Sequence, residues 1–154
     1  MSSEPTGLIA DLATGASVIG VGVDVVCISA FSAQLEQPGT RFAAVFTPQE
    51  RRHAARAGAT TGRPNQHLAA RWAAKEALLK AWSESRFGQP DVIPPEQVDF
   101  QDIEVRCDAL GRPSLRLHGP IAAALVGCTP RVSLSHDLDA DTATAFVVLQ
   151  EDVK

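Results

Sequence analysis

One stretch of the chain concentrates side chains that can do chemistry. Residues 71–81 read RWAAKEALLKA, which places Arg71, Lys75, Glu76 and Lys80 within about three turns of a helix. A carboxylate flanked by ammonium groups can hold a divalent cation and a polyphosphate. The same residues also have an ordinary explanation, in which Lys75 extends its ammonium to water and Glu76 pairs with Lys80 at i,i+4 spacing. The rest of the sequence has to decide between the two.

Two further candidates lie far from this stretch. Asp24 stands in VIGVGVDVV, residues 18–26, on the same expected strand face as Gly20 and Gly22, where glycines would let another backbone or a ligand approach closely. His136 belongs to the segment SLSHD near the C-terminus. Asp24 could equally face water on an open sheet, and a lone histidine is more often a surface residue than a functional one.

The stretch that contains Glu76 is expected on a helix over residues 66–85. This segment contains neither Gly nor Pro and is rich in Ala, Leu, Glu, Lys and Arg, which are good helix formers. Asn65 is a candidate for its N-cap. Four apolar residues share one face, with Lys75 among them, and this face is predicted to pack on the core: Leu68, Trp72, Leu79 and Trp82.

An earlier helix is predicted from a strong start signal. In the segment FTPQE, Thr47 is the N-cap, Pro48 is the first helical residue and Glu50 completes a capping box. We expect this helix to fade at Gly58 and residues 58–65 to form a loop.

The C-terminal third changes to a period-two pattern of apolar and polar residues. It predicts one strand pair at residues 103–117 and a second at residues 131–150. A short helix is expected between them, at residues 120–126. Together with strand 18–26 and a short helix over 27–35, this order predicts an α+β fold. An antiparallel sheet would pack against the long central helix and shorter helices, and the order does not fit a series of βαβ units.

Length and composition narrow the class of protein. With 154 residues, of which 45% are hydrophobic, the chain suits one soluble domain, expected over residues 17–154 after a flexible leader at residues 1–16. No apolar run reaches the length of a membrane span, so we expect no membrane partner. Three widely spaced cysteines indicate neither a disulfide framework nor a zinc site, which favours a cytoplasmic location.

The charges are segregated along the chain. Residues 41–80 hold eight basic and two acidic side chains, although the net charge of the whole chain is −4. A basic middle section predicts an anionic partner. Nucleic acid is a poor candidate, because aromatic residues are scarce and no nucleic-acid motif is present. A phosphorylated small molecule or an acidic protein fits better, and neither a P-loop nor a GxGxxG or GxSxG motif occurs.

Four blocks taken together resemble the 4′-phosphopantetheinyl transferase superfamily, and specifically its small, single-domain holo-acyl-carrier-protein synthases. These blocks are GVDVV (22–26), FTPQE (46–50), RWAAKEALLKA (71–81) and SLSHD (133–137), and the linker GRP (111–113) also fits. The resemblance covers residues 20–149, and WAAKEA with an upstream GVDVV is its most specific part. It implies Mg²⁺-dependent transfer of the phosphopantetheine arm of coenzyme A to a serine of an apo acyl carrier protein. Adenosine 3′,5′-bisphosphate would be released, and the activity would support fatty acid biosynthesis.

The resemblance also implies roles for individual residues, carried over by motif position. Asp24 and Glu76 would bind Mg²⁺, and Lys80 would contact the pyrophosphate and stabilise the leaving charge, which makes Glu76 and Lys80 the catalytic residues. Arg71 and His136 would bind coenzyme A near its phosphates. The general base stays open between Glu76, a metal-bound water and an Asp of another element. Relatives of this type resemble one another in being homotrimers with active sites between subunits, and we expect the same here.

One departure from the family concerns the carrier protein. The expected helix 27–35 contains no arginine, whereas familiar members carry arginines there that dock the acidic carrier. Docking would then use Ile28 and Phe31, or the arginines of the next helix, Arg51, Arg52 and Arg56. The carrier could be a separate protein or a domain of a fatty acid synthase.

Two other functions remain open from the sequence. A Mg²⁺-dependent phosphohydrolase of coenzyme A-like nucleotides would need the same Asp24 and Glu76, with water in place of the serine. A non-catalytic module could bind an acidic protein through the arginines around Arg51.

Overall fold

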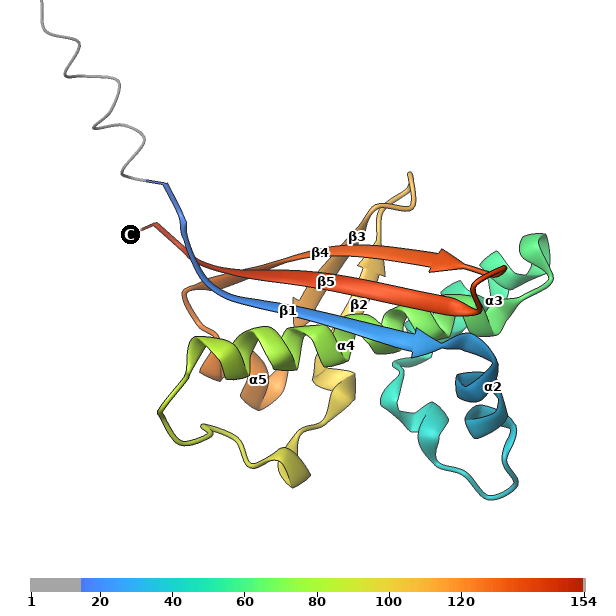
Figure 1. Ribbon diagram of the computed structural model, residues 1–154, viewed down its shortest axis with the longest axis horizontal. Helices are drawn as coiled ribbons and strands as arrows, with labels where there is room; N and C mark the ends of the chain where they lie inside the picture. Colours follow the sequence, from blue (N-terminus) through green and yellow to red (C-terminus); the bar gives the residue numbers. More distant parts are fainter. Residues whose placement is uncertain (1–14, 154) are drawn as a thin grey trace, which may run out of the picture.

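A computed structural model of the protein describes residues 15–153 and shows an α+β fold (Figure 1). The predicted leader, residues 1–16, falls almost wholly on residues 1–14, which lie outside the described part. A three-stranded antiparallel sheet has the order β1-β5-β4, with β1 at Ser17–Cys27, β4 at Cys128–Asp137 and β5 at Thr142–Glu151. A second, two-stranded antiparallel sheet pairs β2 (Ile103–Cys107) with β3 (Pro113–Leu117). The predicted fold class is confirmed.

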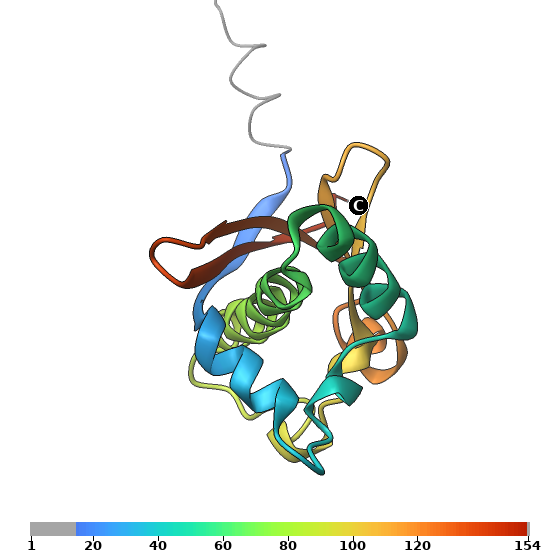
Figure 2. The same cartoon turned by 90° about the vertical axis from the view of Figure 1, so that its right-hand side faces the viewer.

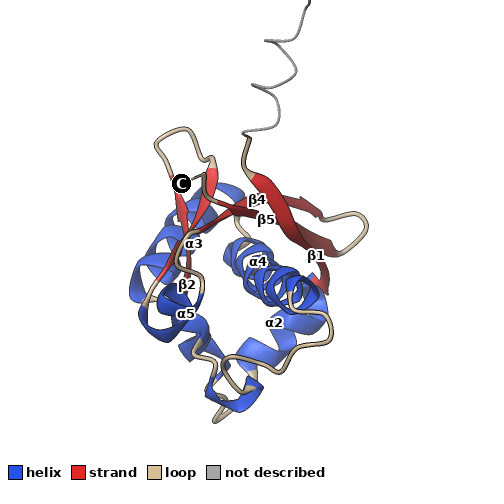
Figure 3. Cartoon of the chain, turned by 90° about the vertical axis from the view of Figure 1, so that its left-hand side faces the viewer, coloured by secondary structure: helices blue, strands red, loops and turns tan. Residues whose placement is uncertain are grey.

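The long helix α4 (Pro64–Ser85) lies beneath the larger sheet in Figure 1. Viewed end-on, α4 has the sheet on one side and other helices around it (Figures 2 and 3). The remaining helices are α2 (Ile28–Glu36), α3 (Pro48–Thr61), α5 (Gly119–Ala124) and the short 3₁₀ turns η1 (Phe42–Val45), η2 (Pro95–Gln97) and η3 (Phe100–Asp102). Across residues 15–153, no helix combines the length and the apolar character needed to cross a bilayer.

The buried face of α4 consists mainly of alanine. Its most buried apolar residues are Ala69, Ala70, Ala73, Ala74, Ala77, Leu78 and Ala81. The predicted face does pack on the core, with Trp82 buried and Leu68, Trp72 and Leu79 half-buried, but the prediction missed the alanines, which are more deeply buried. Small side chains let the sheet come close to the helix axis, and the larger residues pack at the edges of the contact.

Two glycines of β1 meet the alanines of α4. A Cβ atom built on Gly22 would lie 2.0 Å from the carbonyl oxygen of Ala77, and one on Gly20 would lie 2.1 Å from that of Ala81. The prediction that these glycines admit another backbone is confirmed, and that backbone is the central helix. Asp24 is on the same face of β1, so this close contact also brings its carboxylate towards α4.

The boundary between α3 and α4 differs from the prediction. The capping box of Thr47 and Glu50 is present, but α3 continues past Gly58 to Thr61 and ends at Gly62, which adopts a left-handed φ of 73°. The expected loop at residues 58–65 is therefore mostly helical. Asn65 is not the N-cap of α4 either, because the helix already begins at Pro64, one residue before Asn65.

Lys75 does not extend to water as expected. Its side chain has 0% exposure, and its ammonium donates hydrogen bonds to Glu50 Oε2 at 3.0 Å and to the carbonyl oxygens of Phe100 at 2.8 Å and Ile103 at 2.6 Å. Burial lowers the pKa of Lys75, whereas the charge of Glu50 raises it. The lysine of the WAAKEA block is thus a structural residue that joins α4 to α3 and to the start of β2.

The glycine contact yields a stability prediction. Gly22→Ala should lower the free energy of unfolding by more than about 3 kcal/mol, because its new methyl group meets backbone that cannot move aside. Gly39→Ala is the control, since its φ is 76° but no atom lies within 4 Å of the added Cβ; it should cost about 1–2 kcal/mol. Urea unfolding measures both, and equal losses for the two variants would contradict the close-contact interpretation.

Candidate functional site

An open cleft of about 560 Å³ contains both predicted metal ligands. Strand β1 supplies Asp24 and helix α4 supplies Glu76, while α2 forms the other wall. Lys80 reaches the same place, because its ammonium donates hydrogen bonds to Asp24 Oδ1 at 2.8 Å and to the carbonyl oxygen of Val23 at 3.1 Å. The expected i,i+4 pair with Glu76 is thus replaced by a contact between helix and strand. The structure brings all three predicted residues together.

The two carboxylates repel each other. The pKa of Glu76 is raised, first by burial and then by the charge of Asp24, and Lys80 opposes this shift. Two acids against one ammonium leave a net negative charge in the cleft. The cleft therefore favours a cation between the two carboxylates.

The donor atoms suit Mg²⁺ but do not complete its coordination. Among residues 15–153, no three His, Cys, Asp or Glu side chains come together as a metal site. Magnesium in proteins is commonly held by one or two carboxylates, with water and substrate phosphate as the other ligands. Asp24 and Glu76 fit that arrangement, since both offer only oxygen and both line an open cleft.

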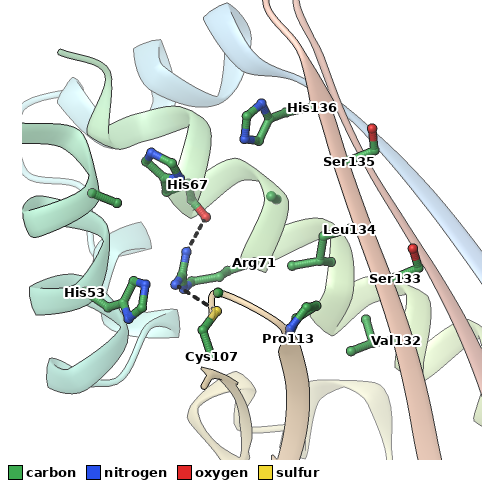
Figure 4. A pocket seen from close by; sticks show the side chains of 13 residues that line it. His53, His67, Arg71, Cys107, Pro113, Val132, Ser133, Leu134, Ser135 and His136 are labelled. Carbon is green, nitrogen blue, oxygen red and sulfur yellow. Dashed lines mark hydrogen bonds between the residues drawn. The ribbon is translucent and has the colours of Figure 1, made fainter. Parts of the chain in front are cut away.

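A second, separate pocket of about 600 Å³ is cationic (Figure 4). It contains Arg71 of α4 and His136 from the end of β4, the two residues predicted to bind coenzyme A. Arg71 as a residue has only 4% exposure. Its Nη1 donates to the carbonyl oxygen of His67 at 2.9 Å, and its Nη2 lies 3.8 Å from the sulfur of Cys107.

Arg71 lacks a carboxylate partner. None of the ion pairs found among residues 15–153 includes it, and its Nε has no hydrogen-bond partner. Burial lowers the pKa of Arg71, as expected for a cation that is removed from water, and the nearby Cys107 and Glu50 only partly oppose this shift. A buried cation of this kind is costly without a compensating anion. The pocket is therefore suited to an anionic ligand.

The cleft and the pocket lie on different sides of α4. Arg71 and Glu76 are five residues apart, which corresponds to about 140° around a helix, and the two cavities share no lining residue. The sequence did not indicate this separation. It also missed His53, His67 and Cys107 of the pocket; the i,i+4 spacing of His67 and Arg71 was a possible signal, whereas His53 comes from another helix.

The two expected docking surfaces for a carrier differ in their exposure. Ile28 and Phe31 are buried, with 7% and 3% exposure, because they pack in a second apolar cluster with Phe46 of the following segment. Their burial counts against the expectation that they dock a carrier. Arginines 51, 52 and 56 are exposed on α3.

Comparison with known proteins defines the class. The profile of the 4′-phosphopantetheinyl transferase superfamily matches residues 20–142, and the chain belongs to this superfamily. The resemblance indicated by the four sequence blocks is confirmed.

Within this class, the chain is similar to holo-[acyl-carrier-protein] synthases. The synthases of Mycobacterium ulcerans and Mycobacterium tuberculosis are 51% and 50% identical to it, each over 133 residues that cover 86% of this chain and 97% of the relative. A solved structure described as the Chronobacterium ammoniagenes ACPS-CoA complex has a TM-score of 0.78 at 44% identity, covering 86% of this chain and 97% of that one. The Mycobacterium tuberculosis acyl carrier protein synthase has a TM-score of 0.69 at 44% identity, covering 88% and 99%.

The raised pKa of Glu76 predicts how its replacement changes stability. A carboxyl group whose pKa is higher in the folded state contributes most below its unfolded pKa, and this contribution is lost as the pH rises through the folded value. Glu76→Gln should therefore raise the melting temperature of the metal-free protein at pH 7 and leave it unchanged near pH 3. Glu96→Gln, at an exposed acid of η2, should change the stability by less than about 0.5 kcal/mol at either pH. A lower melting temperature for Glu76→Gln at pH 7 would contradict the repulsion.

Proposed function

We propose that the protein transfers the 4′-phosphopantetheine arm of coenzyme A to a serine of an apo acyl carrier protein. The products are the holo-carrier and adenosine 3′,5′-bisphosphate, and the reaction supports fatty acid biosynthesis in the cytoplasm. The observation that carries this proposal is the convergence of Asp24, Glu76 and Lys80 in one cleft of a chain from this superfamily.

Each residue of the cleft has a task in this reaction. Asp24 and Glu76 would hold Mg²⁺, which supplies positive charge to the pyrophosphate of coenzyme A. The serine oxygen attacks the phosphorus that bears the pantetheine, and negative charge grows on the departing phosphate. Lys80 stabilises that charge, because its ammonium is held at the cleft by Asp24 and remains half-exposed to an incoming substrate.

The cationic pocket would bind another phosphate of the same coenzyme, through Arg71 and His136. Because this pocket and the carboxylate cleft open on different sides of α4, one coenzyme would use the cleft of one subunit and the pocket of its neighbour. This arrangement supports a homotrimer with active sites between subunits.

The outer face of the large sheet offers a surface for that assembly. Val21, Val23 and Val25 of β1 point away from α4 and are 45%, 52% and 64% exposed, and Phe146 lies opposite Val23 on β5. A contiguous apolar face of this kind typically marks a protein–protein contact. The carrier would dock elsewhere, at the exposed arginines of α3, whose charge complements an acidic protein.

The direct test is to incubate the protein with coenzyme A, Mg²⁺ and an apo carrier and to measure the mass of the carrier. We expect a phosphopantetheine adduct on its serine. Asp24→Ala, Glu76→Ala or EDTA should abolish the adduct, because each removes the metal. Lys80→Ala should slow its formation by roughly 10²–10³-fold, the usual effect of losing one group that stabilises transition-state charge.

Two outcomes would contradict the proposal. Consumption of coenzyme A without an adduct on any carrier would identify a phosphohydrolase. Binding of the carrier with no change in coenzyme A, and no effect of Asp24→Ala, would identify a non-catalytic module.

The assembly gives a separate prediction. Light scattering should report a particle of about three times the 16.3 kDa chain. Phe146→Glu should yield monomers and lose transfer, because a charge on the apolar face opposes its burial. Leu110→Glu, at an exposed leucine of the β2–β3 turn, is the control and should stay assembled. A monomeric and active wild-type protein would contradict active sites shared between subunits.

A further inference from the structure

Two histidines that no motif indicated line the cationic pocket. His53 belongs to α3 and His67 to α4, and Figure 4 shows them on either side of the Arg71 guanidinium, with His136 beyond. The rings of His67 and His136 meet edge-on with their centroids 5.7 Å apart. The pocket thus gathers three imidazoles around one buried guanidinium.

The surroundings of His67 suit both of its protonation states. Its Nε2 lies 3.4 Å from the amide nitrogen of Gln66, which donates to a neutral ring. The other atom of that amide, Oε1, is buried without a hydrogen-bond partner. A rotation of the amide would present Oε1 to a protonated ring, so Gln66 can bind either form.

The ionisable groups that face these histidines are mostly basic. Arg56 lies on α3, Arg71 on α4 and His136 on β4, while β2 adds the thiol of Cys107, and the carboxylate of Glu50 acts on Arg71 from α3. The pKa of His67 is lowered by burial first and then by His136, Arg71 and His53. Burial, Arg71 and Arg56 lower that of His53. Both imidazoles therefore lose their protons more readily than a free histidine does, until an anion reverses the local field.

We propose that His53 and His67 select the 3′-phosphate of coenzyme A, which they bind as a dianion together with Arg71 while taking up protons. This inference rests on the proposed function, which makes coenzyme A the ligand. The 3′-phosphate is a monoester whose second pKa is about 6, so it carries nearly two charges at pH 7. Each phosphate of the pyrophosphate bridge carries only one. Two histidines that gain protons and a buried guanidinium match the doubly charged group.

The proposal gives a defined pH dependence. As the pH falls from about 8 to about 6.5, the imidazoles protonate more readily and the preference for the phosphorylated coenzyme increases. Below about pH 6 the ligand itself is protonated and the preference declines.

Calorimetry on the full-length assembled protein, with Mg²⁺ and without a carrier, can test this. Coenzyme A and dephospho-coenzyme A, which lacks the 3′-phosphate, are titrated in two buffers of different ionisation enthalpy, so that proton uptake is measured directly. The wild type should take up protons with coenzyme A only. His67→Gln and His53→Gln should each reduce this uptake and weaken coenzyme A binding about tenfold or more, with dephospho-coenzyme A unaffected.

His118→Gln is the matched control, because His118 lies outside the pocket and bonds to Glu104 at 2.9 Å. It should keep the wild-type preference and proton uptake, and thermal unfolding verifies that each variant is folded. Equal affinity of the wild type for both coenzymes, or unchanged preference and uptake in both pocket variants, would overturn the inference.

The outcome is separable from that of the transfer assay. If the carrier is modified normally but the histidine variants bind both coenzymes as the wild type does, this inference alone is contradicted. A histidine-dependent preference for coenzyme A with no transfer to any carrier would leave it standing while the proposed function fails.

Discussion

The buried ion pair between Glu50 and Lys75 connects the parts of this structure. The carboxylate of Glu50 accepts hydrogen bonds from the Lys75 ammonium at 3.0 Å and from the backbone N–H groups of Thr47 and Val105 at 2.8 Å each. One side chain thereby closes the N-terminus of α3, holds α4 and binds β2 at Val105, which pairs with Leu115 of β3. A charge so buried is stable only with all of its partners in place, so these elements must assemble together.

This connection determines where chemistry can occur along α4. Lys75 faces the interior, so its neighbour Glu76 points about 100° away, towards β1. The glycines of β1 then let strand and helix approach until Asp24 stands beside Glu76 and Lys80. The close packing of backbone on backbone, rather than any feature of the cleft itself, holds the two carboxylates near each other despite their repulsion.

The helix thus separates two sites of opposite charge. The carboxylate cleft carries net negative charge, which suits a metal ion, and the pocket of Arg71 on another side of the helix carries positive charge, which suits an anion. A ligand that carries a pyrophosphate and a distant phosphate monoester suits two such separate sites. An oligomer would bring the cleft of one subunit next to the pocket of another. The exposed valines of β1 lie on the sheet face that such an assembly would use.

Local signals in the sequence predicted the capping box of α3, the glycine face of β1 and the two antiparallel strand pairs. Four short blocks predicted the superfamily and, by resemblance, the site residues Asp24, Glu76 and Lys80. These features depend on residues close in the chain or on motif resemblance. The role of Lys75, the alanine face of α4 and the burial of Ile28 and Phe31 were decided only by the tertiary structure. Lys75 meets Glu50 from 25 residues away, and alanine is too weakly apolar to reveal a buried face. The histidines of the pocket come from separate helices, so only folding could bring them together around Arg71.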